Sequence, residues 1–330
     1  MAEIIRYGAY VPRYRAPLGE IQAFYGRPGR PRAKTLATPS LDEDTLTMAH
    51  EAGLLALADA PRPGTLIAVS QTPPFRLRKL SGTLARTLGL DGVTPIDLAG
   101  NNASLLDGFE LAGALVESTG TPVLVVATDH LVAHEDRVCD ILSAGAANAF
   151  LIGSAGSGFA QLGPSARATR EVYDTWVLGT EREARYRLEV LFDTYGLLAK
   201  EALGALASAT GNATGDYAAV CASQPHPQTL KALAKAGVSP EQLARTGFVG
   251  ELGNFAGASV GLALTLALDA AASSDRLAVL GYGGGEAIAQ EVTLTGTPPS
   301  TGCAEQIADN ETISVSTYYR WTRDRQAEPL

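Results

Sequence analysis

The chain has 330 residues, of which 46% are hydrophobic and 18% are charged, and its formal net charge is −9 at pH 7. This composition is typical of a compact globular protein, and the acidic balance argues against a nucleic-acid partner, which requires a basic surface. No uninterrupted apolar run is long enough to span a membrane, and the first residues lack the features of a signal peptide. We therefore expect a cytoplasmic protein that does not bind a membrane.

The three cysteines, Cys139, Cys221 and Cys303, have no metal-ligand spacing and cannot form a complete disulfide framework. Their number fits a reducing compartment. No cluster of His, Asp or Glu has metal-ligand spacing either, so we expect no metal site.

Strands and helices alternate along the first half of the chain. Apolar spacing and the positions of Pro and Gly predict strands at 3–10 and 66–69 and helices at about 18–25, 43–57 and 80–88. Gln71 lies in the polar tip that follows the strand ending at Val69. In a buried parallel strand this tip marks the carboxyl end, where ligands bind.

The stretch from Ile96 to Gly108 organises the first half. A few residues of strand character pass through the turn Ala99-Gly100-Asn101-Asn102 into a helix at about 103–117 that is apolar nearly all round. A buried helix start presents unpaired N–H groups and positive dipole charge, which suit an anion, a thiolate or a developing oxyanion. Asn102 is located there, although Asn101 or Asn102 is also a candidate N-cap residue.

Three further strands, predicted at 123–127, 145–152 and 159–162, close the first half. The second half repeats this arrangement with a long helix at 187–208, a strand at 217–222 and a helix at 227–236. Ser223 and His226 lie in the polar tip after the strand at 217–222. Asn254 opens a second apolar helix at 256–271, and a strand at 276–280 ends in the loop Gly281–Gly285.

We therefore predict an α/β fold made of two similar halves, 1–165 and 166–330. Alternating strands and helices favour mostly parallel sheets covered by helices. If both apolar helices lie inside, the layers follow the order helix, sheet, helix, sheet, helix, and the polar tips of the two halves converge.

Five segments resemble the thiolase-like superfamily, and within it the archaeal-type 3-hydroxy-3-methylglutaryl-CoA synthases and the related ketoacyl synthases III. They read RYGAYVPRYR, LDEDTLTMAHEA, VSQTPPF, GNFAGASVGLAL and VLGYGGGEA. The resemblance covers nearly the whole chain. It implies the duplicated five-layer αβαβα sandwich, acyl transfer from CoA or carrier-protein thioesters, and carbon–carbon bond formation by a nucleophilic cysteine, a histidine and a glutamate.

Three of the positions that the resemblance aligns with catalytic residues carry neutral side chains. Asn102 stands at the position of the cysteine, Gln71 at that of the glutamate and Ser223 at that of the histidine, while His226 follows three residues later. A carboxamide neither attacks a thioester as an acyl-accepting nucleophile nor accepts a proton near neutral pH. The acyl-cysteine mechanism is therefore not expected here.

Two further features match the family pattern. Asn254 stands at the position of the family asparagine, and the backbone of Gly283 and Gly284 at that of the oxyanion loop.

Three hypotheses follow. The first is a subunit that binds an acyl-CoA or acyl-carrier thioester, without a tightly bound cofactor, as a homodimer or in a complex with a thiolase and a small zinc-ribbon, OB-fold protein. The second is an enzyme without an acyl-cysteine, in which Asn254 and the glycine loop hold an enolate and His226 is the base. The third moves the nucleophile to Ser104 or Cys221.

Overall fold

The computed structural model describes residues 1–133, 137–179, 181 and 183–324. Its main sheet has nine strands in the order β12-β13-β14-β9-β1-β8-β6-β4-β5. In chain order these strands are β1 (Ala2–Tyr10), β4 (Thr65–Val69), β5 (Thr94–Leu98), β6 (Val123–His130), β8 (Gly145–Ser154), β9 (Ala160–Thr169), β12 (Ala219–Ala222), β13 (Arg276–Gly283) and β14 (Glu286–Leu294).

Two half-sheets make up this sheet. Only two residue pairs, Glu3 with Gln161 and Ile4 with Ala160, join β1 to β9. One half-sheet contains β1, β8, β6, β4 and β5, and the other contains β9, β14, β13 and β12. The proposed division at residue 165 falls inside β9, which pairs along most of its length with β14.

The sheet is mixed in direction. Strands linked through helices pair in parallel, as predicted, in β6-β4-β5 and in β12-β13. The strands of the hairpin β13-β14, and β8 and β9 against their neighbours, run antiparallel. A tight turn between consecutive strands forces the antiparallel direction, whereas a helical crossover allows the parallel one.

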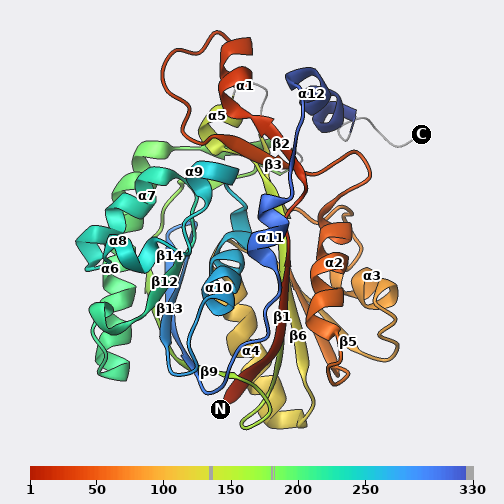
Figure 1. Cartoon of the computed structure of the whole chain (residues 1–330), viewed down its shortest axis with the longest axis vertical. Coiled ribbons are helices and arrows are strands. Elements are labelled where there is room, and N and C mark those ends of the chain that lie inside the picture. Colours follow the sequence, from red (N-terminus) through yellow and green to blue (C-terminus); the bar gives the residue numbers. More distant parts are fainter. Residues whose placement is uncertain (134–136, 180, 182, 325–330) are drawn as a thin grey trace.

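The five expected layers are present (Figure 1). Helices α2 (Thr45–Leu57) and α3 (Leu80–Thr87) cover the outer face of the first half-sheet, and α6 (Leu188–Thr210) and α7 (Pro227–Ala232) lie on the outer side of the second. Helices α4 (Ser104–Thr119) and α10 (Ser259–Asp269) form the central layer and contact strands of both halves. The two apolar helices predicted from the sequence are therefore interior.

Burial explains why these two helices lack a polar face. In α4, Leu105, Leu106 and Phe109 are at most 1% exposed, and nine of the eleven residues of α10 are buried. Complete burial of such a side chain stabilises the fold by about 1.5–3 kcal/mol. This packing fixes the start of α4 between the two half-sheets.

Smaller elements close the ends of the molecule. A three-stranded sheet of β15, β2 and β3 lies with α1 and α12 at the top of Figure 1, and α11 packs against α10 and β1. The bounds of these and the remaining elements are β2 (Tyr14–Pro17), α1 (Leu18–Phe24), β3 (Thr35–Thr38), β7 (Val132–Ala133), α5 (Val138–Ile141), β10 (Thr175–Trp176), β11 (Glu183–Tyr186), α8 (Pro240–Leu243), α9 (Val249–Leu252), α11 (Cys303–Ala308), β15 (Glu311–Thr312) and α12 (Val315–Asp324).

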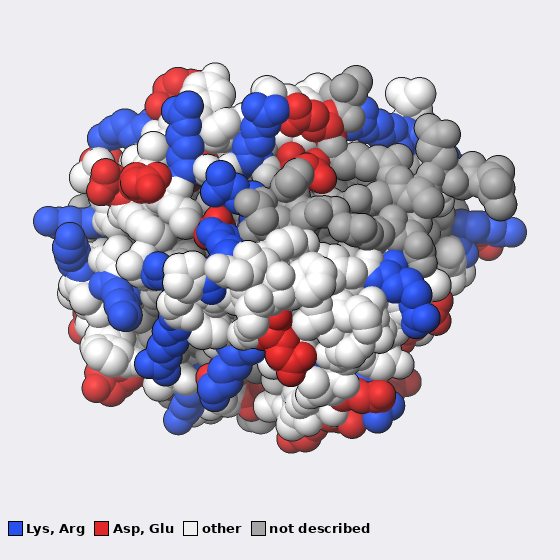
Figure 2. Space-filling model, turned by 90° about the horizontal axis from the view of Figure 1, so that it is seen from above, with Lys and Arg blue, Asp and Glu red and all other residues white. Residues whose placement is uncertain are grey.

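Charged side chains of both signs are interspersed over the face seen in Figure 2. Within the part of the chain that is described, no helix is long and apolar enough to cross a membrane.

Candidate functional site

A pocket opens at the N-terminal end of α4, where polar tips of both halves meet. Its lining includes Gln71, Asn102, Asp174, Pro225, Tyr282 and Gly283. Gln71 follows β4, Asn102 precedes α4, Pro225 follows β12, and Tyr282 and Gly283 end β13. The convergence of the two halves that the sequence predicted is therefore observed at this pocket.

Asn101, rather than Asn102, stabilises the start of α4. Its Oδ1 accepts a 2.7 Å hydrogen bond from the backbone N–H of Ala103, and its own N–H donates to the Ser104 hydroxyl at 3.1 Å. The N-cap residue is Ala103, which has no side-chain cap hydrogen bond. The N-cap interpretation therefore does not describe Asn102, whose side chain bonds elsewhere.

The side chains of Gln71 and Asn102 contact each other directly. Gln71 Nε2 donates to Asn102 Oδ1 at 2.6 Å and lies 3.3 Å from Asp129 Oδ2. The two side chains thus form a hydrogen-bonded carboxamide pair. Neither side chain titrates near neutral pH.

Asp129, at the end of β6, contacts this pair through Gln71. It is fully buried, and its oxygens accept from the backbone N–H groups of Gln71, Thr72 and Gly257 at 2.8–3.0 Å. Burial raises the pKa of Asp129, and hydrogen bonds from Thr72, Gln71 and Gly257 oppose that rise. Because every neighbour in this set is a donor, the carboxylate form is the one that satisfies them.

Ser223 also reaches the start of α4. Its hydroxyl donates to the backbone oxygen of Asn102 at 3.3 Å and accepts from the backbone N–H of Tyr282 at 3.0 Å. The side chain is completely buried. Ser223 therefore ties the turn before α4 to β13, the strand that carries Tyr282.

The glycine loop lies against the same turn. A Cβ atom on Gly283 would lie 2.5 Å from the Asn102 nitrogen, closer than real Cβ contacts, so only glycine fits there. Gly284 has φ +57°, a conformation that glycine adopts without strain. Both glycines line the pocket beside Asn102.

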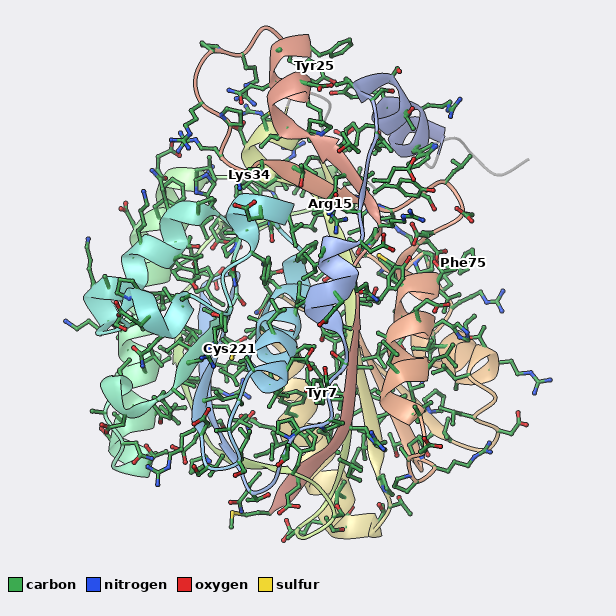
Figure 3. The ribbon with its side chains drawn as sticks, viewed as in Figure 1. Tyr7, Arg15, Tyr25, Lys34, Phe75 and Cys221 are labelled. Atoms are coloured by element: carbon green, nitrogen blue, oxygen red, sulfur yellow. The ribbon has the colours of Figure 1, made fainter. Side chains whose placement is uncertain are left out.

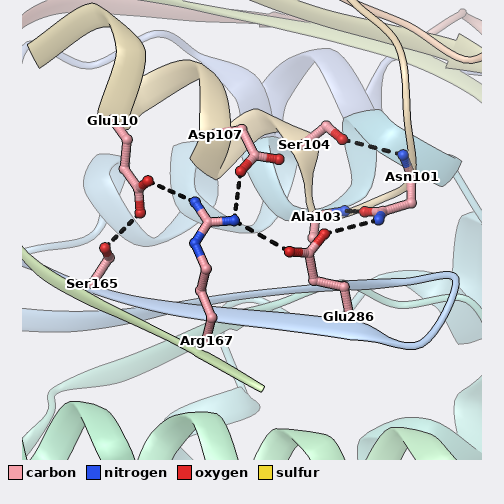
Figure 4. A network of polar contacts seen from close by, with 8 residues as sticks. All are labelled: Asn101, Ala103, Ser104, Asp107, Glu110, Ser165, Arg167 and Glu286. Atoms are coloured by element: carbon pink, nitrogen blue, oxygen red, sulfur yellow. Dashed lines mark hydrogen bonds and ion pairs between the residues drawn. The ribbon is translucent and has the colours of Figure 1, made fainter. Parts of the chain in front are cut away.

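A polar network holds the other side of the turn (Figure 4). Asn101 Nδ2 donates to Glu286 at 3.1 Å, and Arg167 forms ion pairs with Glu286, Asp107 and Glu110 at 3.2, 2.7 and 2.6 Å. One guanidinium therefore links β9, α4 and the start of β14.

His226 and Asn254 are not among the residues that line the pocket. His226 is buried, caps α7 by accepting at Nδ1 from the N–H of Gln228, and lies 4.9 Å from the Phe192 ring. Burial, and after it the charge of Arg32, lowers the pKa of His226 to about 4. Asn254 donates from Nδ2 to Ile141 O at 3.3 Å and accepts at Oδ1 from the N–H of Ala256 at 2.9 Å.

The two alternative nucleophiles occupy different places. Ser104 is in the first turn of α4, where its hydroxyl accepts from the N–H of Asn101. Cys221 is fully buried inside the molecule in β12 (Figure 3), and burial raises the pKa of its thiol. A buried thiol of this kind is typically inert.

Asp174 and Tyr282 are site residues that sequence reasoning did not single out. Asp174 lies just before the short strand β10, in a segment without clear periodicity, and Tyr282 is one residue of the glycine loop. The Tyr282 hydroxyl donates to Asp174 Oδ2 at 2.7 Å. No pattern of spacing pointed to Asp174, because it reaches the pocket through tertiary packing.

Among the described residues, no group of three or more His, Cys, Asp or Glu side chains is arranged to hold a metal ion.

Comparison with known proteins gives consistent relatives. The chain is 29% identical over 300 residues to the hydroxymethylglutaryl-CoA synthase of Aeropyrum pernix, covering 86% of this chain and 82% of that protein. It is 26% identical over 308 residues to the enzyme of Methanobrevibacter smithii, covering 86% of each. No family model matches the sequence.

Solved structures show the same fold. A crystal structure of HMG-CoA synthase complexed with CoA superposes with a TM-score of 0.85 at 17% identity, covering 97% of this chain and 89% of that one. The priming β-ketosynthase of the R1128 polyketide pathway superposes with a TM-score of 0.79 at 21% identity, covering 91% and 97%.

Proposed function

We propose that this chain, a homologue of the archaeal hydroxymethylglutaryl-CoA synthases with the thiolase-like fold, is an acyl-CoA-binding subunit of a condensing or acyl-transfer complex. In this proposal the chain forms no acyl-cysteine. The observation that carries the proposal is the 2.6 Å hydrogen bond between Gln71 and Asn102 at the start of α4. Two carboxamides occupy the place where the resemblance requires a base and a nucleophile.

The chemistry of a carboxamide supports binding rather than covalent catalysis. An amide nitrogen has no available lone pair, so Asn102 has no group that accepts an acyl chain, and Gln71 has no site that accepts a proton near neutral pH. Ser223 uses its hydroxyl to hold Asn102 and Tyr282. An amide N–H does, however, hydrogen-bond a thioester carbonyl.

A basic loop between α1 and β3 supports recognition of CoA. Arg30, Arg32 and Lys34 are exposed there, and the charge of Arg32 lowers the pKa of His226. His226 follows Pro225, which lines the pocket. We infer that these cations contact the phosphate groups of a CoA bound at this pocket.

The open edge of the sheet supports a homodimer. β5 is the last strand on that side of the sheet and only partly buried, so its outer edge offers unpaired backbone groups to a second copy. A thiolase and a zinc-ribbon, OB-fold protein are the further subunits that the resemblance implies. In such a complex this chain would bind the thioester and its partner would supply the acylated nucleophile.

A second candidate function is direct acyl transfer or decarboxylation without an acyl-enzyme. It is favoured by the Gly283–Gly284 backbone, which lines the pocket beside Asn102. Preorganised donors stabilise a thioester enolate, with one oxyanion donor contributing about 2.7–4 kcal/mol in known enzymes.

The test is to mix the purified chain with acetyl-CoA, malonyl-CoA and acetoacetyl-CoA and to follow bound ligand, intact mass and free CoA together. We expect saturable binding, no mass increase and no CoA release until a thiolase partner is added. Release of CoA without an adduct would instead support the second candidate. A stable adduct on Ser104 or Cys221 would overturn both.

A further inference from the structure

The pocket at the start of α4 has an unusual balance of charge. Asp174 lines it, and none of the described residues in the lining is Lys, Arg or His. Asp174 is only 1% exposed, so solvent does not screen its carboxylate effectively.

One oxygen of this carboxylate is satisfied and the other is not. Oδ2 accepts the Tyr282 hydroxyl at 2.7 Å, whereas Oδ1 has no hydrogen-bond partner among the described residues. Buried polar atoms without partners are rare in folded proteins and call for an explanation such as a missing ligand. A ligand with a hydrogen-bond donor would complete the set.

The neighbours of Asp174 hold the carboxylate in place. The Tyr282 hydroxyl also contacts the Thr194 hydroxyl at 2.8 Å, and its ring lies 4.8 Å from the Tyr195 ring. The backbone oxygen of Asp174 accepts from the N–H of Arg187 at 2.8 Å. Burial raises the pKa of Asp174, and the hydrogen bond from the Tyr282 hydroxyl opposes the rise. An ammonium group on a ligand would favour the charged form further.

We propose that this pocket takes acyl thioesters whose acyl chain ends in a hydrogen-bond donor, an ammonium or a hydroxyl group, and rejects chains that end in a carboxylate. The proposal rests on the proposed function, because it assumes that the pocket holds the acyl end of a CoA thioester. Asp174 is then the residue that determines specificity. A carboxylate on the ligand would face Asp174 with no cation in the described lining to neutralise it, and both charges would be poorly hydrated.

Four three-carbon thioesters that differ only at C3 test this directly: β-alanyl-CoA, 3-hydroxypropionyl-CoA, propionyl-CoA and malonyl-CoA. Their affinities for the wild-type chain are measured by calorimetry, with CoA alone as the reference. We expect β-alanyl-CoA and 3-hydroxypropionyl-CoA to bind at least about 10-fold more tightly than malonyl-CoA. The affinity of propionyl-CoA should lie between that of these two thioesters and that of malonyl-CoA. Asp174→Asn should weaken β-alanyl-CoA about 10-fold and change propionyl-CoA by less than about 2-fold.

Asp193→Asn is the matched control, because it removes the same charge from an exposed position on α6. It should leave all four affinities unchanged. If Asp174→Asn does not fold, the order of affinities in the wild-type chain decides by itself. Malonyl-CoA binding as tightly as propionyl-CoA, or donor-bearing chains binding no better than propionyl-CoA, would overturn the inference while leaving CoA binding intact. Failure of CoA and all four thioesters to bind would instead refute the proposed function.

Discussion

Gly283 lies directly against the backbone of Asn102: a Cβ atom on Gly283 would be 2.5 Å from the Asn102 nitrogen and 3.0 Å from the Asn101 Cβ. The end of β13 therefore packs against the turn before α4 with no room for a side chain between them. This contact joins the two halves of the chain at the pocket, and it depends on the absence of a side chain.

Gly283→Ala should destabilise the chain because β13 and the turn have to separate to admit the methyl group. We expect a loss of about 1–3 kcal/mol, measured by urea unfolding. Gly204→Ala is the control, since Gly204 is exposed on α6 and a Cβ there would meet nothing within 4 Å. That variant should gain about 0.5–1 kcal/mol from helix propensity. If Gly283→Ala and Gly204→Ala change the unfolding free energy by the same amount, the close approach of Gly283 to Asn102 is not the cause of the loss.

Gln71→Glu should destabilise the chain, and more so at higher pH. The new carboxylate would replace a donor that lies 3.3 Å from Asp129 Oδ2 and 2.6 Å from Asn102 Oδ1. Repulsion from Asp129 raises the folded-state pKa of the introduced acid, so the unfolded state releases its proton first and the stability penalty grows as pH rises above about 4. Urea midpoints at pH 4 and pH 7 measure it, with an expected penalty of about 1–3 kcal/mol at pH 7.

The exposed Gln228→Glu in the first turn of α7 is the control for this charge change. It should be neutral or slightly stabilising, because a carboxylate near a helix N-terminus interacts favourably with the dipole. A Gln71→Glu variant as stable as the wild type at pH 7 would contradict the contact between Gln71 and Asp129.

Sequence reasoning located the framework of the molecule because apolar periodicity reports burial. The interior position of α4 and α10 followed from helices without a polar face, and the strands Thr65–Val69 and Val123–His130 followed from apolar runs. The strands β2, β3 and β14 were not anticipated. β2 and β3 are only four residues long, and β14 is set by its hairpin with β13, so local pattern carried little information about them.

The site was predictable only where a turn or a strand end marked it. Asn102, Gln71 and Ser223 each follow or precede a recognisable element, and hydrogen bonds link Asn102 to both of the others. Asp174 comes from an irregular segment and meets Tyr282 across 108 residues of sequence. A contact of that range is fixed by packing of the two halves, which no local pattern reveals.

Asn102→Cys alone should not produce an acylated protein within minutes of adding acetyl-CoA. The helix start favours a thiolate, but neither Gln71 nor Ser223 is a general base, and a missing base lowers such rates about 10²- to 10⁴-fold. Intact mass spectrometry measures the adduct, with Asn102→Ser as the control for side-chain size. Rapid and complete acylation would mean that Asp174 or His226 reaches the sulfur, and the proposed binding role would then need revision.

Arg167→Gln should destabilise the chain mainly at low salt. The guanidinium neutralises Asp107, Glu110 and Glu286, and its loss leaves three carboxylates close together. Because these groups are about one third exposed, we expect a modest loss of about 1 kcal/mol at low ionic strength that shrinks in 1 M NaCl. Arg86→Gln, which removes an ion pair with Asp91 on the exposed surface, should change stability far less. A salt-independent loss would point to packing rather than charge.

The final prediction concerns acid stability and follows from the buried His226. Its folded-state pKa is about 4, lowered by burial and then by Arg32, whereas the ordinary value is 6.5. The unfolded chain therefore binds a proton that the folded chain does not, so stability is complete above about pH 6.5 and declines as pH falls toward 4. The decline attributable to this residue reaches at most about 3 kcal/mol.

His226→Asn keeps an acceptor for the N-cap of α7 and removes the titration, so its unfolding free energy should fall less steeply between pH 7 and pH 4.5 than that of the wild type. His50→Asn, on the exposed side of α2 beside Thr87, is the control and should leave the slope unchanged. Parallel slopes for the wild type and His226→Asn would mean that His226 titrates normally and that solvent reaches it.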